Sequence, residues 1–290
     1  MLSPTLSVIS RFKNLAGALA LITASLFTTG CAETIPEGAI RVMSYNLRYA
    51  NSDLDAFNAR KKLLADSVIV AGVDVLAIQE GDEPWMDELT ELLPEYSYVG
   101  VGRDDGAEAG EFSAIFYITD KFEVLDSGTF WLSPTPEVPS FGWGANNRRI
   151  CTWAVLRNIE TGETYTHYNT HLDHESQLAR VNGTALILDH MKTSNYPVVL
   201  TGDLNTPEGS DLYQTIEDTI LADTKHTAEL TKSHGTINWF FPVDTGIVID
   251  FVFSQEDAFL VHRYDVITFY EVNEKPVSDH YPVYADLTFL

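Results

Sequence analysis

Two side chains suited to hydrolytic chemistry follow a short apolar run near residue 200. The run from Pro197 to Leu200 is typical of a buried strand, and Asp203 and Asn205 come just after it. Residues two apart on extended chain point the same way, so this carboxylate and this carboxamide can converge beyond the strand end. Loops held by a rigid sheet often carry function, although Asp and Asn also suit an ordinary turn.

Polar side chains recur where other predicted strands end, and they are Asn46, Glu80, His171, Asp279 and His280. A further carboxylate, Asp250, lies inside an apolar run from 247 to 253, where an unpaired charge is costly. Carboxylates with amides and imidazoles, and no cysteine cluster, suit a hard divalent ion such as Mg²⁺ or Mn²⁺. Zinc is disfavoured because no tight His spacing occurs, and Walker and GxSxG motifs are also absent.

The elements that must position these groups follow from hydrophobic spacing. Ser52 or Asp53 caps a predicted helix whose apolar face carries Phe57, Leu64, Val68 and Ala71 and which ends at Gly72. A short helix is predicted at about 85–92, and strands at 40–46, 75–78, 98–101, 112–117, 122–130, 150–158 and 164–170. A helix at 175–192 is predicted to turn Leu178, Val181, Ala185 and Leu188 inward, and a helix from about 210 and strands at 247–253, 266–270 and 282–289 follow.

The composition is typical of one large globular domain. Of 290 residues, 45% are hydrophobic, and no apolar span after residue 33 is long enough to cross a membrane. The net charge of −24 opposes tight non-specific binding to nucleic acid, which depends on Lys and Arg at phosphates. Acidity also keeps an exported protein soluble, and it does not exclude a nuclease with a local basic patch.

The first 31 residues resemble an export signal. Arg11 and Lys13 precede an apolar run from 15 to 27, and Thr28-Thr29-Gly30-Cys31 is similar to a bacterial lipoprotein cleavage box with Thr28 replacing the usual Leu. Cleavage after Ala32 is the alternative, and an uncleaved buried helix is a third. We expect an exported protein, either a periplasmic or outer-membrane lipoprotein tethered through lipidated Cys31 or a secreted one, with residues 32–38 as a short tether.

Cys151 is the second of two cysteines, and it has no partner once Cys31 is lipidated or removed. Its apolar neighbours Ile150, Trp153 and Val155 place it in the predicted core. We therefore expect no disulfide, although the exported compartment is oxidising.

Taken in order, the polar motifs resemble those of the endonuclease/exonuclease/phosphatase superfamily, which includes DNase I-like nucleases, sphingomyelinases and inositol polyphosphate phosphatases. The resemblance covers almost all of the chain after residue 39 and rests on Ser44-Tyr45-Asn46, Ile78-Gln79-Glu80, Asn169-Thr170-His171, Gly202-Asp203-Leu204-Asn205, Ile249-Asp250-Phe251 and Ser278-Asp279-His280. Arg103 and the stretches 130–133 and 149–153 are similar to an exported bacterial subgroup. The resemblance implies one domain at 39–290 with an α/β fold, a four-layer sandwich of two packed mixed β-sheets flanked by helices, as in DNase I.

The resemblance also implies a role for each site residue. Metal binding falls to Glu80, Asn46 and Asp279, with Mg²⁺ or Mn²⁺ as the ion. The implied catalytic residues are Asp203, which orients or deprotonates water, Asn205, which helps to hold that water or the metal, and His280, Asp250 and His171, which bind phosphate or orient the group that does. Arg103 and Arg149 are implied substrate contacts.

One position departs from the family pattern. Some nuclease members carry an acidic residue two positions after the first Asn, whereas this chain has Arg48, which leaves both a one-metal and a two-metal site open. Arg48 is expected to face either the substrate or solvent. The remaining histidines are expected to be structural or on the surface, with His174 bordering the site.

The leading interpretation is an exported, metal-dependent phosphoesterase that cleaves a P–O bond by activated-water attack, with a diester favoured over a monoester. Three substrate classes compete. A secreted nuclease needs a basic groove, although the chain has only 18 Lys and Arg in total, and a sphingomyelinase-like phospholipase needs exposed apolar hairpins, for which Phe141 and Trp143 are candidates. A small phosphorylated sugar, inositol or glycan phosphodiester needs only a compact pocket and is preferred. The non-enzymatic alternative is a binding lipoprotein that keeps the fold, and a monomer is expected.

Overall fold

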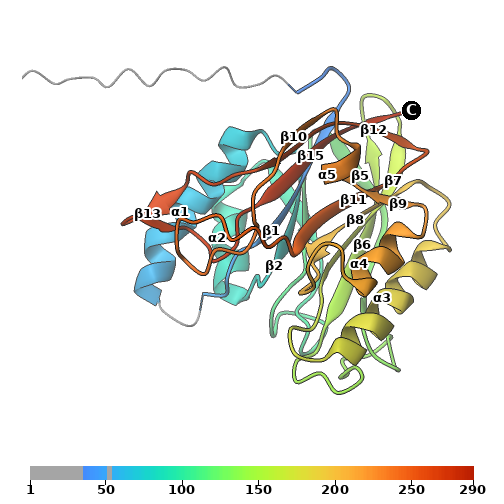
Figure 1. Ribbon diagram of the computed structural model, residues 1–290, viewed down its shortest axis with the longest axis horizontal. Helices are drawn as coiled ribbons and strands as arrows, with labels where there is room; N and C mark the ends of the chain where they lie inside the picture. Colours follow the sequence, from blue (N-terminus) through green and yellow to red (C-terminus); the bar gives the residue numbers. More distant parts are fainter. Residues whose placement is uncertain (1–34, 51–53) are drawn as a thin grey trace, which may run out of the picture. The chain divides into compact units, whose positions relative to one another are not determined.

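Two mixed β-sheets pack face to face in the computed structural model, which describes residues 35–50 and 54–290 (Figure 1). The seven-stranded sheet runs in the order β10 (Leu230–Lys232), β12 (Phe259–Val266), β15 (Val283–Phe289), β1 (Ile40–Asn46), β2 (Val75–Gln79), β4 (Ile115–Ile118) and β3 (Tyr96–Val99). The six-stranded sheet runs β5 (Phe122–Trp131), β6 (Ile150–Asn158), β7 (Thr164–His171), β8 (Val198–Asp203), β11 (Asp250–Gln255) and β9 (Leu221–Asp223). Strands β13 (Glu271–Val272) and β14 (Lys275–Pro276) pair only with each other.

Helices cover the outer face of each sheet (Figure 1). Helices α1 (Leu54–Ala71) and α2 (Glu83–Leu92) pack on the seven-stranded sheet, and α3 (Gln177–Met191) and α4 (Asp211–Glu217) pack on the six-stranded sheet. A single turn, α5 (Thr224–Thr227), follows β9. This arrangement confirms the predicted four-layer sandwich of two mixed sheets between helices.

Three buried apolar clusters hold the layers together. The middle cluster lies between the sheets and includes Val42 of β1 and Val199 of β8. On the outer face of β1, Met43 packs with Phe57 and Leu64 of α1, as the apolar spacing of that helix predicts. Alternate residues of one strand therefore enter different layers, because successive side chains of a strand point to opposite faces.

The inward face predicted for the helix at 175–192 is wrong for Leu178, Val181 and Ala185, which are exposed, whereas Leu188 packs against the buried cluster as predicted. Leu178 and Val181 are 60% and 45% exposed, and the buried residues of α3 are Ala179, Gly183, Thr184, Ile187 and Met191. The side chain of Leu132 accounts for the glycine on the buried face, because a Cβ at Gly183 would lie only 3.2 Å from Leu132 Cδ1. Small residues let the helix approach its neighbours closely, and hydrophobic spacing does not register that advantage.

Two strand boundaries also differ from prediction. Asp250 begins β11 and does not lie in the middle of a strand, although it is fully buried. A strand was predicted at 266–270, but the observed strand β12 spans Phe259–Val266 and ends at the first of these residues. Strand β12 also carries a register shift between Val261 and Arg263. The bulge interrupts the period-two alternation by which a strand is recognised.

The predicted segments at the N-terminus lie largely outside the described residues. These are the signal at 1–31, tether residues 32–34 and the helix caps Ser52 and Asp53. Residues Ile35–Leu290 form one compact unit. None of the helices within the described ranges is long and apolar enough to cross a membrane. Cys151 is buried and free, as expected.

A row of buried polar side chains joins the two sheets directly beneath the strand ends. Asn169 of β7 donates from Nδ2 to the carbonyls of Ile78 at 2.7 Å and Ala114 at 3.0 Å, both on the seven-stranded side. Gln79 of β2 donates from Nε2 to Asn169 Oδ1 at 2.8 Å and to Ser44 Oγ at 3.2 Å. These bonds, which we call the amide clamp, fix one sheet against the other.

Candidate active site

Strand pairing brings the polar strand ends of the six-stranded sheet together. In the parallel pair β7–β8 His171 lies beside Asp203, and in the antiparallel pair β8–β11 Asp250 lies on the other side of Asp203. Directly paired residues share a face of the sheet, so these three side chains point the same way, toward the other sheet. The second sheet contributes Asn46 at the end of β1 and Glu80 directly after β2.

Backbone turns redirect two of the predicted site residues. Gln79 faces the space between the sheets, so simple alternation would point Glu80 toward the helices. Glu80 instead adopts a left-handed φ of 58°, and Asn205 has a φ of 48°. Such conformations are costly for residues other than glycine and concentrate at functional sites. Asn205 therefore does not follow Asp203 by extended alternation, and its Nδ2 donates to the Leu172 carbonyl at 3.0 Å.

Asn46 connects the two halves of the site. Its Nδ2 donates to Glu80 Oε1 at 3.1 Å and to Asp203 Oδ2 at 2.9 Å, while its Oδ1 accepts from the Arg48 amide at 3.0 Å. The structure thus places Asn46 beside Glu80, with its amide nitrogen turned to both carboxylates.

One buried cation, Arg60, and one indole, that of Trp85, support the loop after β1. Arg60 donates to the carbonyls of Leu47, Arg48 and Tyr49, and Trp85 Nε1 donates to the Arg48 carbonyl at 2.8 Å. This support fixes the Tyr49 amide, which donates to Glu80 Oε2 at 3.1 Å. The carboxylate of Glu80 is therefore positioned from two sides.

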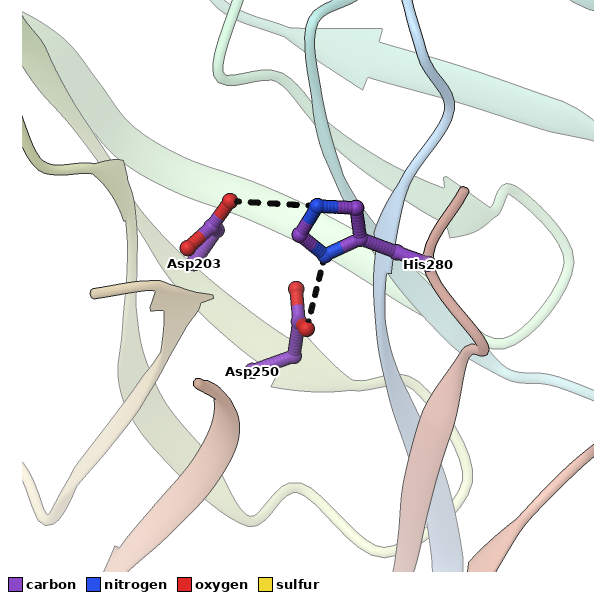
Figure 2. Close-up of side chains that lie close together, drawn as sticks. All are labelled: Asp203, Asp250 and His280. Carbon is purple, nitrogen blue, oxygen red and sulfur yellow. Dashed lines mark hydrogen bonds and ion pairs between the residues drawn. The ribbon is translucent and has the colours of Figure 1, made fainter. Parts of the chain in front are cut away.

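Asp250 and Asp203 flank the imidazole of His280 (Figure 2). His280 Nδ1 lies 2.8 Å from Asp250 Oδ2, and Nε2 lies 3.9 Å from Asp203 Oδ2. Burial lowers the pKa of His280, but the charge and hydrogen bond of Asp250, with Asp203 and Asp279, outweigh it and raise the pKa to about 10. His280 is therefore an imidazolium cation at neutral pH.

Asp203 has the properties of a general base. Burial and then the Asp250 charge raise its pKa to about 7, while His280 and the hydrogen bonds from Asn205 and Asn46 act in the opposite direction. The backbone N–H of Asn205 donates to Asp203 Oδ1 at 2.9 Å. A carboxylate with a pKa near the working pH can both accept a proton from water and release it again.

Glu80 and Asp279 form the part of the site that suits a metal ion. Both carboxylates approach the guanidinium of Arg48 only loosely, with Nη1 at 4.0 Å from Glu80 Oε2 and 3.6 Å from Asp279 Oδ2. Burial, and repulsion from Glu80 among the further causes, raise the pKa of Asp279. Two crowded carboxylates that share one partner match the hard oxygen ligands of Mg²⁺ or Mn²⁺. Arg48 therefore faces the site.

Asp203, Asp250 and His280 also bring one potential ligand atom each within 4.8 Å of one another. An imidazolium has no lone pair to give to a metal, so the charge state of His280 favours its pairing with the two carboxylates. By this chemistry, Glu80 and Asp279 are the stronger candidates for holding a metal ion.

The opposite end of the site is cationic. Arg149 is 5% exposed, and among the described residues its Nη1 has no hydrogen-bond partner. Its Nη2 lies 3.0 Å from His174 Nδ1, and its Nε pairs loosely with Asp173 Oδ2 at 3.6 Å. Burial and then the neighbouring charge of Arg103 lower the pKa of Arg149. An unsatisfied buried cation is costly, so this end of the site favours an anionic ligand.

His171 and Arg103 lie at the same end of the site as Arg149. His171 Nε2 lies 3.5 Å from Asp203 Oδ2, and its buried Nδ1 has no hydrogen-bond partner within the described ranges. Burial, then Arg149 and Arg103, lower the pKa of His171 well below its usual value, so its imidazole is neutral. Arg103 donates through both terminal nitrogens to Glu111, at 2.7 and 2.8 Å, and thus enters the site already paired.

The predicted site residues, except Asn46 and Asp250, line one cavity of about 530 Å³ together with Arg48 and His174. Sequence reasoning did not select several of its other lining residues, namely Tyr49, Glu111, Asn147, Ile237 and Trp239. Glu111 follows Arg103 by eight residues in a loop, where no periodic spacing marks a partner. Ile237 forms a β-bridge with His280, a long-range pairing that no local pattern reveals.

Comparison with known proteins agrees with this geometry. Residues 43–280 match the model of the Endonuclease/Exonuclease/phosphatase family. A mannosyl-6-phosphatase of Bacteroides thetaiotaomicron is 38% identical, with a TM-score of 0.82 over 86% of this chain and 100% of that chain. A member of the same family from Bacteroides vulgatus is 34% identical, with a TM-score of 0.79 over 87% of this chain and 99% of that chain.

A more distant relative is an uncharacterized protein of Acanthamoeba polyphaga mimivirus, 25% identical over 244 residues, which cover 77% of this chain and 89% of that protein. The span that matches the family model, residues 43–280, contains every strand-end motif from Asn46 to His280. By this match and by its fold, the chain belongs to the endonuclease/exonuclease/phosphatase family of phosphoric ester hydrolases.

Proposed function

We propose that this enzyme is a metal-dependent phosphomonoesterase that removes a terminal phosphate from a small sugar. The observation that carries the proposal is the buried Arg149, whose Nη1 is unsatisfied at the cationic end of the cavity. A terminal phosphate carries more negative charge than a diester and offers more unesterified oxygens to such a group. The similarity to a mannosyl-6-phosphatase supports the same substrate class.

The size and charge of the molecule support a small substrate. A cavity of about 530 Å³ lies within the usual range of about 300–1,000 Å³ for small-molecule sites. The net charge of −24 disfavours an extended nucleic acid, which needs a row of Lys and Arg along its phosphates.

Each residue then has a definite task. Glu80 and Asp279, with Asn46 beside them, would hold Mg²⁺ or Mn²⁺, which supplies charge stabilisation at a phosphoryl oxygen. Asp203 accepts the proton of the attacking water, and Asn205 orients Asp203 through its amide. His280, fixed by Asp250, presents a cationic N–H to the phosphate, and His171 and Arg149 donate to its remaining oxygens.

A panel of substrates tests the proposal. We expect wild-type protein to hydrolyse a hexose 6-phosphate with Mg²⁺ or Mn²⁺ and to lose this activity in EDTA. Asp203→Asn should lower the rate by at least about a hundredfold, the scale of a lost general base. Arg149→Lys keeps the charge but loses the planar guanidinium, so it should impair monoester hydrolysis more than diester hydrolysis.

A diester substrate is the second candidate, and it is the one that the sequence favoured, because the family covers both reactions. Metal-dependent cleavage of a diester without cleavage of the monoester would refute the proposal and select this candidate. Hydrolysis of neither ester in the presence of metal would refute both.

We further propose export of the enzyme and attachment to a membrane through a lipid on Cys31, as a monomer. The charged, apolar and small-residue order of residues 11–31 supports this location. Labelling of expressing cells with a fatty acid would place label on the wild-type chain and none on Cys31→Ser, whereas equal labelling would refute the anchor.

A further inference from the structure

The catalytic cavity has one apolar wall, and it lies beside Asp279 and His280. Most side chains that line the cavity are charged or amides, whereas Trp239 and Ile237 are apolar. Trp239 is 53% exposed, and within the described part of the chain its indole stacks on no other aromatic ring. The cavity has a second aromatic lining residue, Tyr49, but the guanidinium of Arg48 lies over its ring at 4.7 Å, so the indole of Trp239 is the more open aromatic surface.

The segment that carries this indole, residues 236–247, is tied to the catalytic residues. The backbone N–H groups of Asn238 and Trp239 both donate to the Asp279 carbonyl, at 2.7 and 3.2 Å. The hydroxyl of Thr236 accepts from the Asp250 amide at 3.2 Å, and Ile237 forms a β-bridge with His280. The backbone that carries the indole is therefore held in position relative to the groups proposed to act on phosphate.

Backbone strain within the segment also indicates function. Trp239 and Phe240 adopt left-handed φ values of 52° and 61° in succession, a conformation that residues with a side chain rarely adopt. The buried Asn238 supports it, because its Oδ1 accepts from the Phe240 amide at 2.7 Å. Such strain persists only where surrounding contacts enforce it, and it clusters at ligand sites.

We propose that Trp239 is the platform on which the ring of the substrate's leaving group stacks, and that this ring is a pyranose sugar. The inference rests on the proposed phosphomonoesterase function and adds a ring subsite to it. The apolar C–H face of a pyranose fits a flat aromatic surface, while Asn147, Asn205 and His174 of the same cavity can bind its hydroxyls. An exposed indole beside hydroxyl-binding groups in a compact cavity suits this amphipathic ring better than a nucleobase of an extended strand, which needs successive stacking surfaces.

Phe241 provides a matched control. It lies two residues from Trp239, is 63% exposed and does not line the cavity. Substitution of either residue removes a similar exposed aromatic group, but only Trp239 is in position to contact a bound substrate.

The test compares a hexose 6-phosphate with a ringless ester, glycerol phosphate, on wild-type protein, Trp239→Ala, Trp239→Phe and Phe241→Ala. Loss of the apolar area that a pyranose face buries on the indole should raise the KM for the hexose ester, relative to that for the ringless ester, by about tenfold. The kcat for the hexose ester should change by less than about threefold, because stacking binds ground state and transition state alike. Trp239→Phe should restore most of the loss, and Phe241→Ala should match wild type.

Three results would overturn the platform. The first is an equal KM change for both esters in Trp239→Ala, and the second is a loss in Phe241→Ala as large as in Trp239→Ala. The third result needs an additional substrate, a lipid phosphate in vesicles. If Trp239→Ala and Phe241→Ala both lose activity on this lipid and on neither soluble ester, residues 236–247 form a membrane contact.

If wild type hydrolyses neither ester, the phosphomonoesterase proposal itself fails. The subsite is then decided by saturation-transfer NMR with the hexose 6-phosphate. Signal on the ring protons with wild type and none with Trp239→Ala would uphold the platform, and equal signals or none at all would refute it.

Discussion

Replacement of Asn169 by Leu should destabilise the whole domain, because this side chain is the centre of the amide clamp. Asn169 is fully buried and makes four hydrogen bonds: it donates to Ile78 O and Ala114 O, and it accepts from Gln79 Nε2 and, at 3.3 Å, from Thr201 Oγ1. A buried hydrogen bond contributes about 0.5–1.5 kcal/mol net, so loss of the set should lower the free energy of unfolding by about 4 kcal/mol. Leu has a similar volume, so cavity formation adds little.

Thr170→Val is the matched control on the same strand. Thr170 is equally buried, but its hydroxyl makes one bond, to the Ile150 carbonyl at 2.9 Å within its own sheet. Urea denaturation should therefore show a loss of about 1 kcal/mol for this variant. If Asn169→Leu loses no more than Thr170→Val, the clamp does not contribute as the bonds suggest, and the reasoning is refuted.

Two further predictions concern the metal ion and pH. Glu80→Gln should lower affinity for Mg²⁺ or Mn²⁺ by at least about tenfold in calorimetry, because even residues that only contact a metal ligand contribute that much. Substitution of the exposed Glu83 by Gln is the control. An unchanged titration in Glu80→Gln would show that Glu80 does not bind the metal. Burial lowers the pKa of His167 from its usual 6.5 to about 3, so stability is full above pH 6.5 and falls as pH decreases and the unfolded chain takes up the proton. Between pH 7 and pH 5 wild type should lose about 2 kcal/mol more than His167→Gln in urea denaturation, and equal losses would contradict this.

The sequence predicted the layered fold and the site residues together because the same motifs mark both. Each motif joins an apolar strand to a polar end, so the sequence predicts that Asn46, Glu80 and His171 lie at one edge of the fold. It also assigns Asp203 and Asp250 to one site, but only the register of β8 with β11 shows that these two residues are neighbours in space.

The features that sequence reasoning missed depend on close packing or on long-range contact. The buried face of α3 was assigned to large residues, whereas Gly183 faces the core because Leu132 needs the space. Gln79 is recognisable in the sequence only as part of a motif. Nothing in its neighbouring residues predicts the hydrogen bond that it makes to Asn169 in the other sheet. Trp239 lies in a loop whose position depends on bonds to Asp279, forty residues further along the chain.

The division of the site between two sheets ties binding to folding. Glu80, Asp279 and His280 belong to one sheet and its connections, and Asp203 and Asp250 belong to the other. Separation of the sheets would therefore divide the cluster of His280 with the two aspartates, although Glu80 and Asp279 would stay on one side. A ligand that bridges the halves binds the intact domain alone and adds to its stability, by about 2.7 kcal/mol at a hundred times its Kd. A phosphate bound between His280 and His171 would thus hold the two sheets together, and a protease should cut the loaded protein more slowly than the empty one.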